Sequence, residues 1–314
     1  MHIAQIGTGR VGRPTAYSIM EARLPGTLTL CDTKPGLATA FGEELKHVKA
    51  STQNNVEILS CERAEQIADA DIILISAGEP RKPGIKMSRR DLAVQNARII
   101  KQISEATRSR NPAAKYIVIT NPVDAMAMVC KKYTRAEYVI STGTNLESMR
   151  FRSVLSEKFR VPLMQVEGWV GGEHGDAAVP LWSTAKINHL SIEEYSASKG
   201  ISLQRLEIEL YVKSVSKFIV DSIGGTEYGP AASFRDITRA IVEDTNETLS
   251  VAAPVRFAEI AEPVHVGVPT RIGRTIGISL YQSLTETEKN SILEAAKAIY
   301  QTYLLAVEGL ETPK

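Results

Sequence analysis

His174 is the residue of this chain best suited to move a proton. It lies in the run Gly171 to Asp176, Gly-Gly-Glu-His-Gly-Asp, among small and acidic residues. An imidazole near its ordinary pKa can donate or accept a proton around neutrality, so this run is a candidate site of general acid/base chemistry. The other histidines lack such neighbours and are expected to be surface or structural residues: His2, His47, His189 and His265.

A glycine-rich turn follows the first apolar run of the chain. Gly7, Gly9 and Gly12 have the spacing Gly-x-Gly-x-x-Gly. Arg10 and Val11 lie between the last two and are expected, with the glycines, to contact a ligand bound at this turn. Such glycines allow a tight turn, let the backbone approach a pyrophosphate, and let the next helix pack on the strand. The N-terminus of that helix offers unpaired N–H groups to phosphates. The motif alone has little specificity.

Asp32 gives the glycine turn its context. It lies twenty residues after Gly12, at the end of the second apolar run. A carboxylate there can accept hydrogen bonds from an adenosine ribose and repels a 2′-phosphate. Strand, turn, helix and acid in this order predict a binding site for NAD rather than NADP.

A cationic loop follows the fourth apolar run, at the edge where doubly wound sheets bind ligands. Five of the ten residues from Arg81 to Arg90 are Lys or Arg. The loop lacks aromatic residues, while its prolines and glycines are typical of a shaped lid. From these residues alone, a solvated charge run or a nucleic-acid patch is an equal alternative.

The elements that must position these residues follow from the hydrophobic pattern. Short apolar runs separated by helix-length intervals predict βαβ units and a parallel sheet. The runs are Ile3 to Ile6, Leu28 to Cys31, Val56 to Leu59, Ile72 to Ile75, Tyr116 to Ile119 and Tyr138 to Ile140.

Longer amphipathic segments appear after residue 142. Residues 203–217 and 293–303 have helical spacing. Val251 to Ile260 and Pro263 to Val268 are expected to be strands of a second, antiparallel sheet. The predicted fold class is therefore α/β: a doubly wound parallel sheet of the Rossmann type in residues 1–142, followed by an α+β substrate domain in residues 143–314.

The composition excludes several classes of protein. Hydrophobic residues make up 43% and charged residues 23% of the chain, as in globular rather than disordered proteins. A net charge of +1 gives no general field for nucleic acid. Cys31, Cys61 and Cys130 lack metal-binding spacing and are expected to be buried thiols in a reducing compartment, with no metal site. Without a targeting segment or an apolar run of ~18 residues, a cytoplasmic protein with no membrane partner is expected.

Taken in order, these motifs resemble the lactate and malate dehydrogenase family, and within it the lactate-dehydrogenase-like malate dehydrogenases. The resemblance extends from residue 2 to the C-terminal helix. It rests on the glycine turn, Asp32, Pro80 to Gly84, Arg89, Thr120-Asn121-Pro122, Arg150 and the Gly-Glu-His-Gly-Asp run. It implies an NAD-dependent homo-oligomer, dimer or tetramer, that interconverts (S)-malate and oxaloacetate by hydride transfer.

The resemblance also implies catalytic roles. His174 matches the general acid/base, and Glu147 stands where the family carries the carboxylate paired with it. Arg150 matches the planar, two-pronged donor for the C1 carboxylate of the substrate. Arg89 corresponds to the loop arginine that polarises the carbonyl when the lid closes.

Three further residues match contacts of the family. Asn121 resembles the residue that orients substrate and cofactor, and Asn96 matches a cofactor contact. Arg81 lies where the family selects its substrate, with arginine typical of malate enzymes and glutamine of lactate enzymes. An arginine buried against a methyl group instead of a second carboxylate would be unpaired, at a cost of roughly 3 kcal/mol or more.

The chain departs from the family pattern in three places. Glu147 replaces the customary Asp, the segment from Gly84 to Arg89 is two residues longer than usual, and Thr226 is typical of lactate enzymes. A lactate dehydrogenase or a relaxed 2-oxo acid reductase is therefore an alternative. A nicotinamide-binding sensor without turnover and an RNA-binding protein are alternatives of other classes. His174, Arg89 and Arg150 argue against the sensor, and the near-neutral net charge argues against RNA binding.

Overall fold

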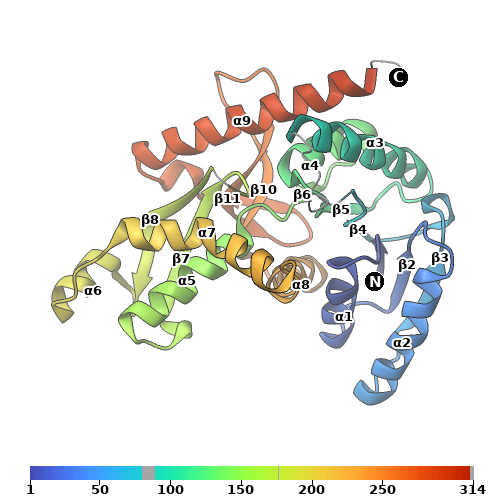
Figure 1. The fold of residues 1–314 in the computed structure, drawn as a ribbon, viewed down its shortest axis with the longest axis horizontal. Coiled ribbons are helices and arrows are strands. Elements are labelled where there is room, and N and C mark those ends of the chain that lie inside the picture. The colour runs from blue at the N-terminus through green and yellow to red at the C-terminus, as the bar shows by residue number, and fades with distance from the viewer. Residues whose placement is uncertain (80–88, 176, 312–314) are drawn as a thin grey trace.

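An open parallel sheet forms the first half of the chain (Figure 1). The computed structural model describes residues 1–79, 89–175 and 177–311. The strands are β1 His2–Ile6, β2 Thr27–Cys31, β3 Glu57–Cys61, β4 Ile72–Ile75, β5 Lys115–Val118 and β6 Val139–Ser141. Their order, β3-β2-β1-β4-β5-β6, reverses direction at β1 and β4, as in a doubly wound sheet. The six predicted strands are confirmed, with ends displaced by no more than two residues.

Helices cover both faces of this sheet. α1 (Gly12–Glu21) and α2 (Leu37–Thr52) pack on one face, and α3 (Arg89–Arg108) and α4 (Val123–Thr134) on the other. A short 3-10 helix, η1 (Ala64–Gln66), follows β3. The buried positions of α1 are three to four residues apart, the period of one helix face.

The second half continues the same sheet with antiparallel strands. They are β7 Val166–Gly172, β8 Ala178–Ile187, β9 Leu190–Ser191, β10 Glu247–Val255, β11 Val264–Ile272 and β12 Ile276–Ser279. β10 pairs with β6 through Ala252 and Ser141, and the order continues β10-β11-β7-β8-β9. The expected second sheet is thus not separate. The pairing gives β6 a partner on a side that would otherwise be an open edge.

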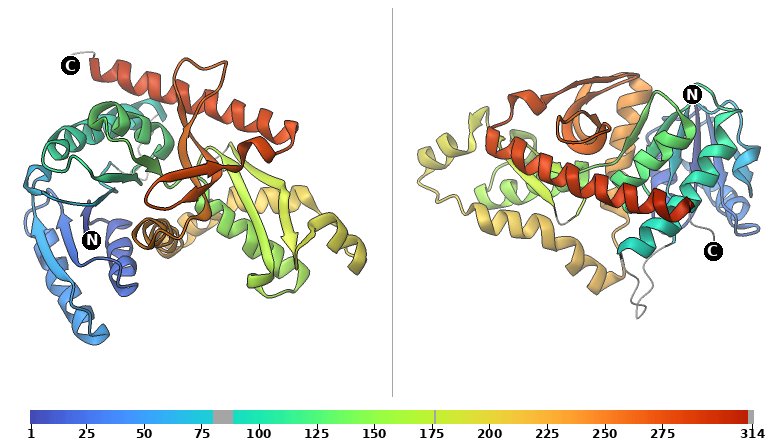
Figure 2. Two further views of the ribbon diagram at one scale, coloured as in Figure 1. Left: turned by 180° about the vertical axis from the view of Figure 1, so that it is seen from behind. Right: turned by 90° about the horizontal axis from the view of Figure 1, so that it is seen from above.

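The helices of the second half reach back onto the first. They are α5 Asn145–Phe159, η2 Leu163–Gln165, α6 Ile192–Lys199, α7 Arg205–Ile223, α8 Tyr228–Glu243, η3 Leu280–Ser283 and α9 Glu286–Glu311. α7 and α9 confirm the two predicted helices. α8 packs on α1, and α9 lies along α3 and α4, where both views of Figure 2 show it. α5, α6 and α7 enclose a smaller core with β7 and β8.

The two predicted domains meet in the connection between β6 and α5. The boundary between residues 142 and 143 lies in this connection and stays a prediction. Across the described ranges, no helix combines the length and apolar character needed to cross a membrane.

Candidate active site

His174 lies in the tight connection between β7 and β8. The two strands pair antiparallel up to Gly172 and Ala178, so the connection leaves the sheet directly at its end. Gly172 has φ +87° and Gly175 has φ +134°, values that favour glycine. These two glycines explain why small residues flank the histidine in the sequence.

Glu147 is the carboxylate that His174 contacts. It lies in the first turn of α5, and only 3% of it is exposed. Both of its carboxylate oxygens are 3.2 Å from Nδ1 of His174. Arg150, one helical turn later, donates from Nη1 to Oε1 of the same carboxylate at 3.2 Å. The structure therefore brings three predicted site residues into one cluster.

Electrostatic attraction sets the protonation state of this cluster. The negative charge of Glu147 raises the pKa of His174 to about 9, although burial opposes the shift. Burial acts to raise the pKa of Glu147, but the charges of His174 and Arg150 outweigh it and the pKa is lowered. At neutral pH the pair is an imidazolium and a carboxylate, and Nε2 is the ring nitrogen left to act on a substrate.

Asp124, in the first turn of α4, also holds the catalytic turn in place. Its Oδ2 accepts a hydrogen bond from the backbone N–H of His174 at 2.9 Å, and Oδ1 accepts one from the hydroxyl of Ser141 at 2.6 Å. Burial raises the pKa of Asp124, while these two hydrogen bonds favour its charged form. Asp124 is not among the site residues that the sequence predicts. Its only signal was an acid three residues after the Asn121 motif, which is also typical of an ordinary helix N-terminus.

The glycine turn has the shape that a dinucleotide phosphate requires. Gly7 has φ +90°, and a Cβ on it would lie 2.6 Å from the backbone nitrogen of Ala77. A Cβ on Gly12 would lie 1.9 Å from the carbonyl oxygen of Gly7, so this glycine lets α1 pack against the turn. A Cβ on Gly9 would have no heavy atom within 4 Å. Gly9 therefore leaves open space beside the backbone, as close approach of a pyrophosphate demands.

Asp32 is held against this turn. Its Oδ2 accepts hydrogen bonds from the backbone N–H of Thr8 at 2.7 Å and from the Thr8 hydroxyl at 3.1 Å. Its Oδ1 accepts from the backbone N–H of Lys34 at 3.0 Å. The carboxylate is thus fixed at the end of β2, where a ribose hydroxyl can donate to its remaining lone pairs. The turn and this acid together fit an NAD molecule.

Arg10 contacts the second half of the chain. Its guanidinium donates to the carbonyl of Gly224 and lies 3.3 Å from the carboxylate of Glu227. Thr226, a predicted substrate contact, is half-buried in the same segment before α8. These contacts join the glycine turn to the loop that carries Thr226. The predicted role of Arg10 in cofactor binding stays a prediction.

Asn96 is buried and fully engaged with backbone groups. Its Oδ1 accepts from the N–H of Glu79 at 2.8 Å, and its Nδ2 donates to the carbonyl of Asn121 at 2.6 Å. Asn96 therefore fixes the segment that carries Asn121, whose own side chain is exposed. A direct contact of either residue with a ligand stays a prediction.

Two predicted arginines fall where the structure gives no side-chain description. Arg81 lies in residues 80–88, outside the described ranges. Arg89 begins α3, but its side chain is outside the description. Their assigned roles rest on the sequence alone.

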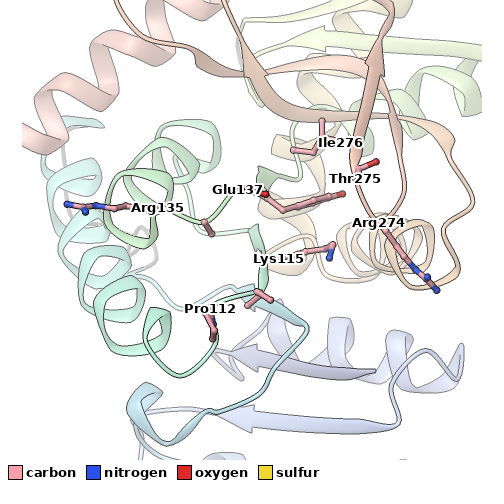
Figure 3. A pocket seen from close by; sticks show the side chains of 11 residues that line it. Pro112, Lys115, Arg135, Glu137, Arg274, Thr275 and Ile276 are labelled. Carbon is pink, nitrogen blue, oxygen red and sulfur yellow. The ribbon is translucent and has the colours of Figure 1, made fainter.

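A cavity of about 620 Å³ lies away from this cluster, at the start of β5 and the β11–β12 connection. It is at the amino ends of the parallel strands, opposite the edge that carries the glycine turn. Figure 3 shows Arg135 and Arg274 directed away from each other at its two ends. Among the residues with a described position, no group of three or more His, Cys, Asp or Glu is arranged to hold a metal ion.

Comparisons with known proteins match both halves of the chain to one family. Residues 1–139 match the lactate/malate dehydrogenase NAD binding domain, and residues 144–303 match the lactate/malate dehydrogenase alpha/beta C-terminal domain. The chain is 39% identical over 310 residues to a malate dehydrogenase of Sulfurisphaera tokodaii, which covers 99% of this chain and 97% of that protein. It is 31% identical over 303 residues to an L-lactate dehydrogenase of Bacillus caldolyticus, covering 95% and 94%.

A solved structure extends the likeness to the whole fold. It is a lactate dehydrogenase from a Medee basin deep-sea metagenome library, with a TM-score of 0.91, 26% identity and 98% of both chains covered. The fold and the site define an NAD-dependent 2-hydroxy acid dehydrogenase. The chain belongs to the lactate/malate dehydrogenase family.

Proposed function

We propose that this protein is a malate dehydrogenase that interconverts (S)-malate and oxaloacetate with NAD. The observation that carries the proposal is the cluster in which Glu147 touches both His174 and Arg150. It places a charged imidazole beside a guanidinium that can bind a carboxylate. Arg81 and the 39% identity to a malate dehydrogenase favour a four-carbon dicarboxylate over pyruvate.

In the proposed reaction, NADH bound at the glycine turn supplies the hydride added at C2 of oxaloacetate. His174 gives its Nε2 proton to the carbonyl oxygen as the alkoxide forms, and takes it back in the reverse direction. Glu147 holds the ring by Nδ1, so that the proton to be transferred is on the other nitrogen. Arg150 binds the C1 carboxylate, Arg89 stabilises the developing negative charge, and Arg81 binds the C4 carboxylate.

Asp124 acts through position rather than contact with the substrate. It ties the backbone of His174 to α4, which follows the Asn121 segment directly. Asp124 therefore fixes the position of the proton donor, His174, relative to the nucleotide-binding half of the enzyme. We expect Asn121 and Thr226 to complete the substrate site from its two sides.

We also infer a homo-oligomer. Large apolar side chains are exposed along α7, and they include Leu206, Leu210, Phe218 and Ile223. Large exposed apolar side chains gathered on one helix are a feature of many protein interfaces. A second copy of the chain is the partner that the family resemblance favours.

The proposal is tested by measuring NADH oxidation with oxaloacetate, pyruvate and 2-oxoglutarate in parallel. We expect kcat/KM to be highest for oxaloacetate, and NADH to be preferred over NADPH because Asp32 repels a 2′-phosphate. A kcat/KM for pyruvate that equals or exceeds that for oxaloacetate would favour the lactate enzyme, to which Thr226 points. No turnover with any of the three would favour a sensor.

A further inference from the structure

Two cysteines that are thirty residues apart in sequence lie side by side at the edge of the sheet. Cys31 ends β2, Cys61 ends β3, and the two are paired in register. Side chains of residues paired in register leave the same face of a sheet, so the two thiols are neighbours. Neighbouring strands are about 4.8 Å apart, within the Cα separation of about 4.4–6.8 Å that disulfides span. The two sulfurs can therefore bond with only small movements of the strands.

The two thiols differ in access and in reactivity. Cys31 is buried, while Cys61 is partly exposed on β3, which is the outermost strand of the sheet. This corrects the expectation that all three cysteines are buried. The neighbouring Cys31 thiol lowers the pKa of Cys61, although burial opposes the shift. Cys61 is thus the thiol that an oxidant reaches first. Cys31 lies next to it and can react with the sulfenic acid that forms on Cys61.

The backbone of both cysteines supports the nucleotide site. The carbonyl of Cys31 accepts the N–H of Gly7 at 2.8 Å, and the carbonyl of Cys61 accepts the N–H of Asp32 at 3.2 Å. Asp32 in turn accepts the N–H of Thr8 at 2.7 Å. A shift of either strand end therefore moves the glycine turn relative to the ribose-binding carboxylate.

We propose that Cys31 and Cys61 form a reversible disulfide that weakens NADH binding. The oxidant is a peroxide. The Cys61 thiolate attacks one peroxide oxygen, the O–O bond breaks, and a sulfenic acid forms as the leaving oxygen takes a proton. The Cys31 sulfur then attacks the Cys61 sulfur, and the S–O bond breaks. The hydroxide leaves with the thiol proton as water, so two electrons pass from the thiols to the peroxide.

The disulfide weakens NADH binding because its geometry differs from that of two free thiols. The sulfurs move to about 2 Å apart and the bond takes a fixed dihedral angle. The ends of β2 and β3 rotate to allow this bond geometry. Gly7 and Asp32 move with the carbonyls of Cys31 and Cys61, to which their N–H groups donate. Because Cys61 is partly exposed, an added thiol can reach the disulfide and reduce it.

The test uses purified enzyme and stoichiometric hydrogen peroxide. Mass spectrometry of alkylated digests is expected to show a peptide pair joined through Cys31 and Cys61. NADH titration by fluorescence is expected to show Kd raised about tenfold, equivalent to about 1.4 kcal/mol. Dithiothreitol is expected to restore both. NADH added before the peroxide is expected to lower the yield of disulfide, because a disulfide that weakens NADH binding is itself disfavoured by bound NADH.

Single substitutions distinguish the effect of the Cys31–Cys61 disulfide from the effect of oxidation at other residues. Cys61→Ser removes a partly exposed thiol, and its NADH affinity is expected to be unaffected by peroxide. Cys130→Ser, on buried α4, keeps the full response and serves as the matched control. The proposal is overturned if no joined peptide forms, if the disulfide forms while Kd is unchanged, or if Cys61→Ser responds like the wild type. These readouts do not depend on which 2-oxo acid the enzyme reduces.

Discussion

At the scale of single residues, one carboxylate serves two cations. Glu147 contacts the imidazole of His174 with both oxygens and the guanidinium of Arg150 with one. The extra methylene of Glu relative to Asp is therefore absorbed without loss of the contact. The charge of Glu147 is what holds His174 protonated at neutral pH, so this pair should set the pH dependence of the reaction.

Oxaloacetate reduction should be independent of pH around neutrality and fall to half of its maximum near pH 9. The reason is that reduction requires protonated His174, whose pKa is raised to about 9 by Glu147. Glu147→Gln removes that charge, so the decline should begin at a lower pH and kcat at neutral pH should fall. Glu147→Asp keeps the charge and should keep measurable activity with a shifted profile. Profiles of kcat/KM for the three enzymes test this. If Gln is tolerated as well as Asp, the charge is not what the histidine uses.

Loss of the imidazole should affect chemistry far more than cofactor binding. His174→Asn removes the proton donor, and kcat is expected to fall by a factor on the order of 10² or more. The NADH Kd should stay close to that of the wild type, because the glycine turn and Asp32 are unchanged. Stopped-flow turnover and fluorescence titration measure the two effects separately. Turnover near the wild-type rate would exclude His174 as the general acid.

Substrate choice should depend on Arg81. Arg81→Gln removes a charge-assisted contact with the C4 carboxylate, and kcat/KM for oxaloacetate should fall at least roughly 10²-fold, the equivalent of ~2.7 kcal/mol. Pyruvate should gain in kcat/KM, since its methyl group no longer faces an unpaired cation. Steady-state rates with both substrates check this. An unchanged preference would mean that another loop cation, Lys82, Lys86 or Arg90, binds the second carboxylate.

The sequence allows a site residue to be predicted only where that residue belongs to a recognisable motif. His174, Glu147 and Arg150 were candidates before the structure placed them together. Asp124 was not, because its contact is with the backbone of His174, and a residue fifty positions away leaves no local pattern. The neighbourhood of Cys31 and Cys61 depends likewise on strand register and not on spacing in the chain.

At the scale of elements, two glycines of the same turn have different roles: Gly12 allows close packing of the backbone, and Gly9 leaves space for a ligand. A Cβ on Gly12 would meet the carbonyl oxygen of Gly7, whereas a Cβ on Gly9 would enter open space. Gly12→Ala should therefore lower the free energy of unfolding by about 1–3 kcal/mol through overpacking. Gly9→Ala should leave stability within about 0.5 kcal/mol of the wild type while raising the NADH Kd at least about tenfold.

Thermal unfolding and NADH titration of both variants distinguish these effects. Each variant is the control for the other, since Gly9→Ala and Gly12→Ala both add one methyl group to the same turn. Equal loss of stability in the two variants, or an unchanged Kd in Gly9→Ala, would contradict the assignment of phosphate approach to Gly9.

The elements themselves were predictable to different degrees. Five of the parallel strands are buried on both faces and appear as short apolar runs, whereas the edge strand β3 is largely exposed and is marked by its apolar run alone. β7 and β8 position His174, yet no prediction was made for them. Glycines make up three of the seven residues of β7, and Pro180 interrupts β8. Both features are unfavourable for strands in general and hide the pattern.

At the scale of the whole molecule, joining the two halves into one sheet depends on pairings that the sequence does not encode locally. β6 meets β10 through residues more than a hundred positions apart, Ser141 and Ala252. Hydrophobic patterns indicate that each strand exists but not which strand lies next to it. The predicted separate sheet was wrong for this reason.

Assembly should depend on the exposed apolar side chains of α7. Leu210 is 58% and Phe218 71% exposed, and the double substitution Leu210→Glu with Phe218→Glu should dissociate the proposed homo-oligomer by placing charges in the proposed interface. Lys46→Glu, which adds a negative charge on α2, should leave assembly unchanged. Sedimentation velocity measures the outcome. A double variant that retains the wild-type mass would place the interface elsewhere.

The position of α9 bears on how the chain is made. This last helix packs on α3 and α4, and Gly309 approaches so closely that a Cβ there would lie 2.5 Å from the side chain of Val94. α9 covers an apolar face of the nucleotide-binding half. That face is therefore exposed to solvent while the chain is still being synthesised on the ribosome. That half cannot complete its core until the end of the chain has emerged. Synthesis and final folding of the first half are separated by the time needed to translate the second.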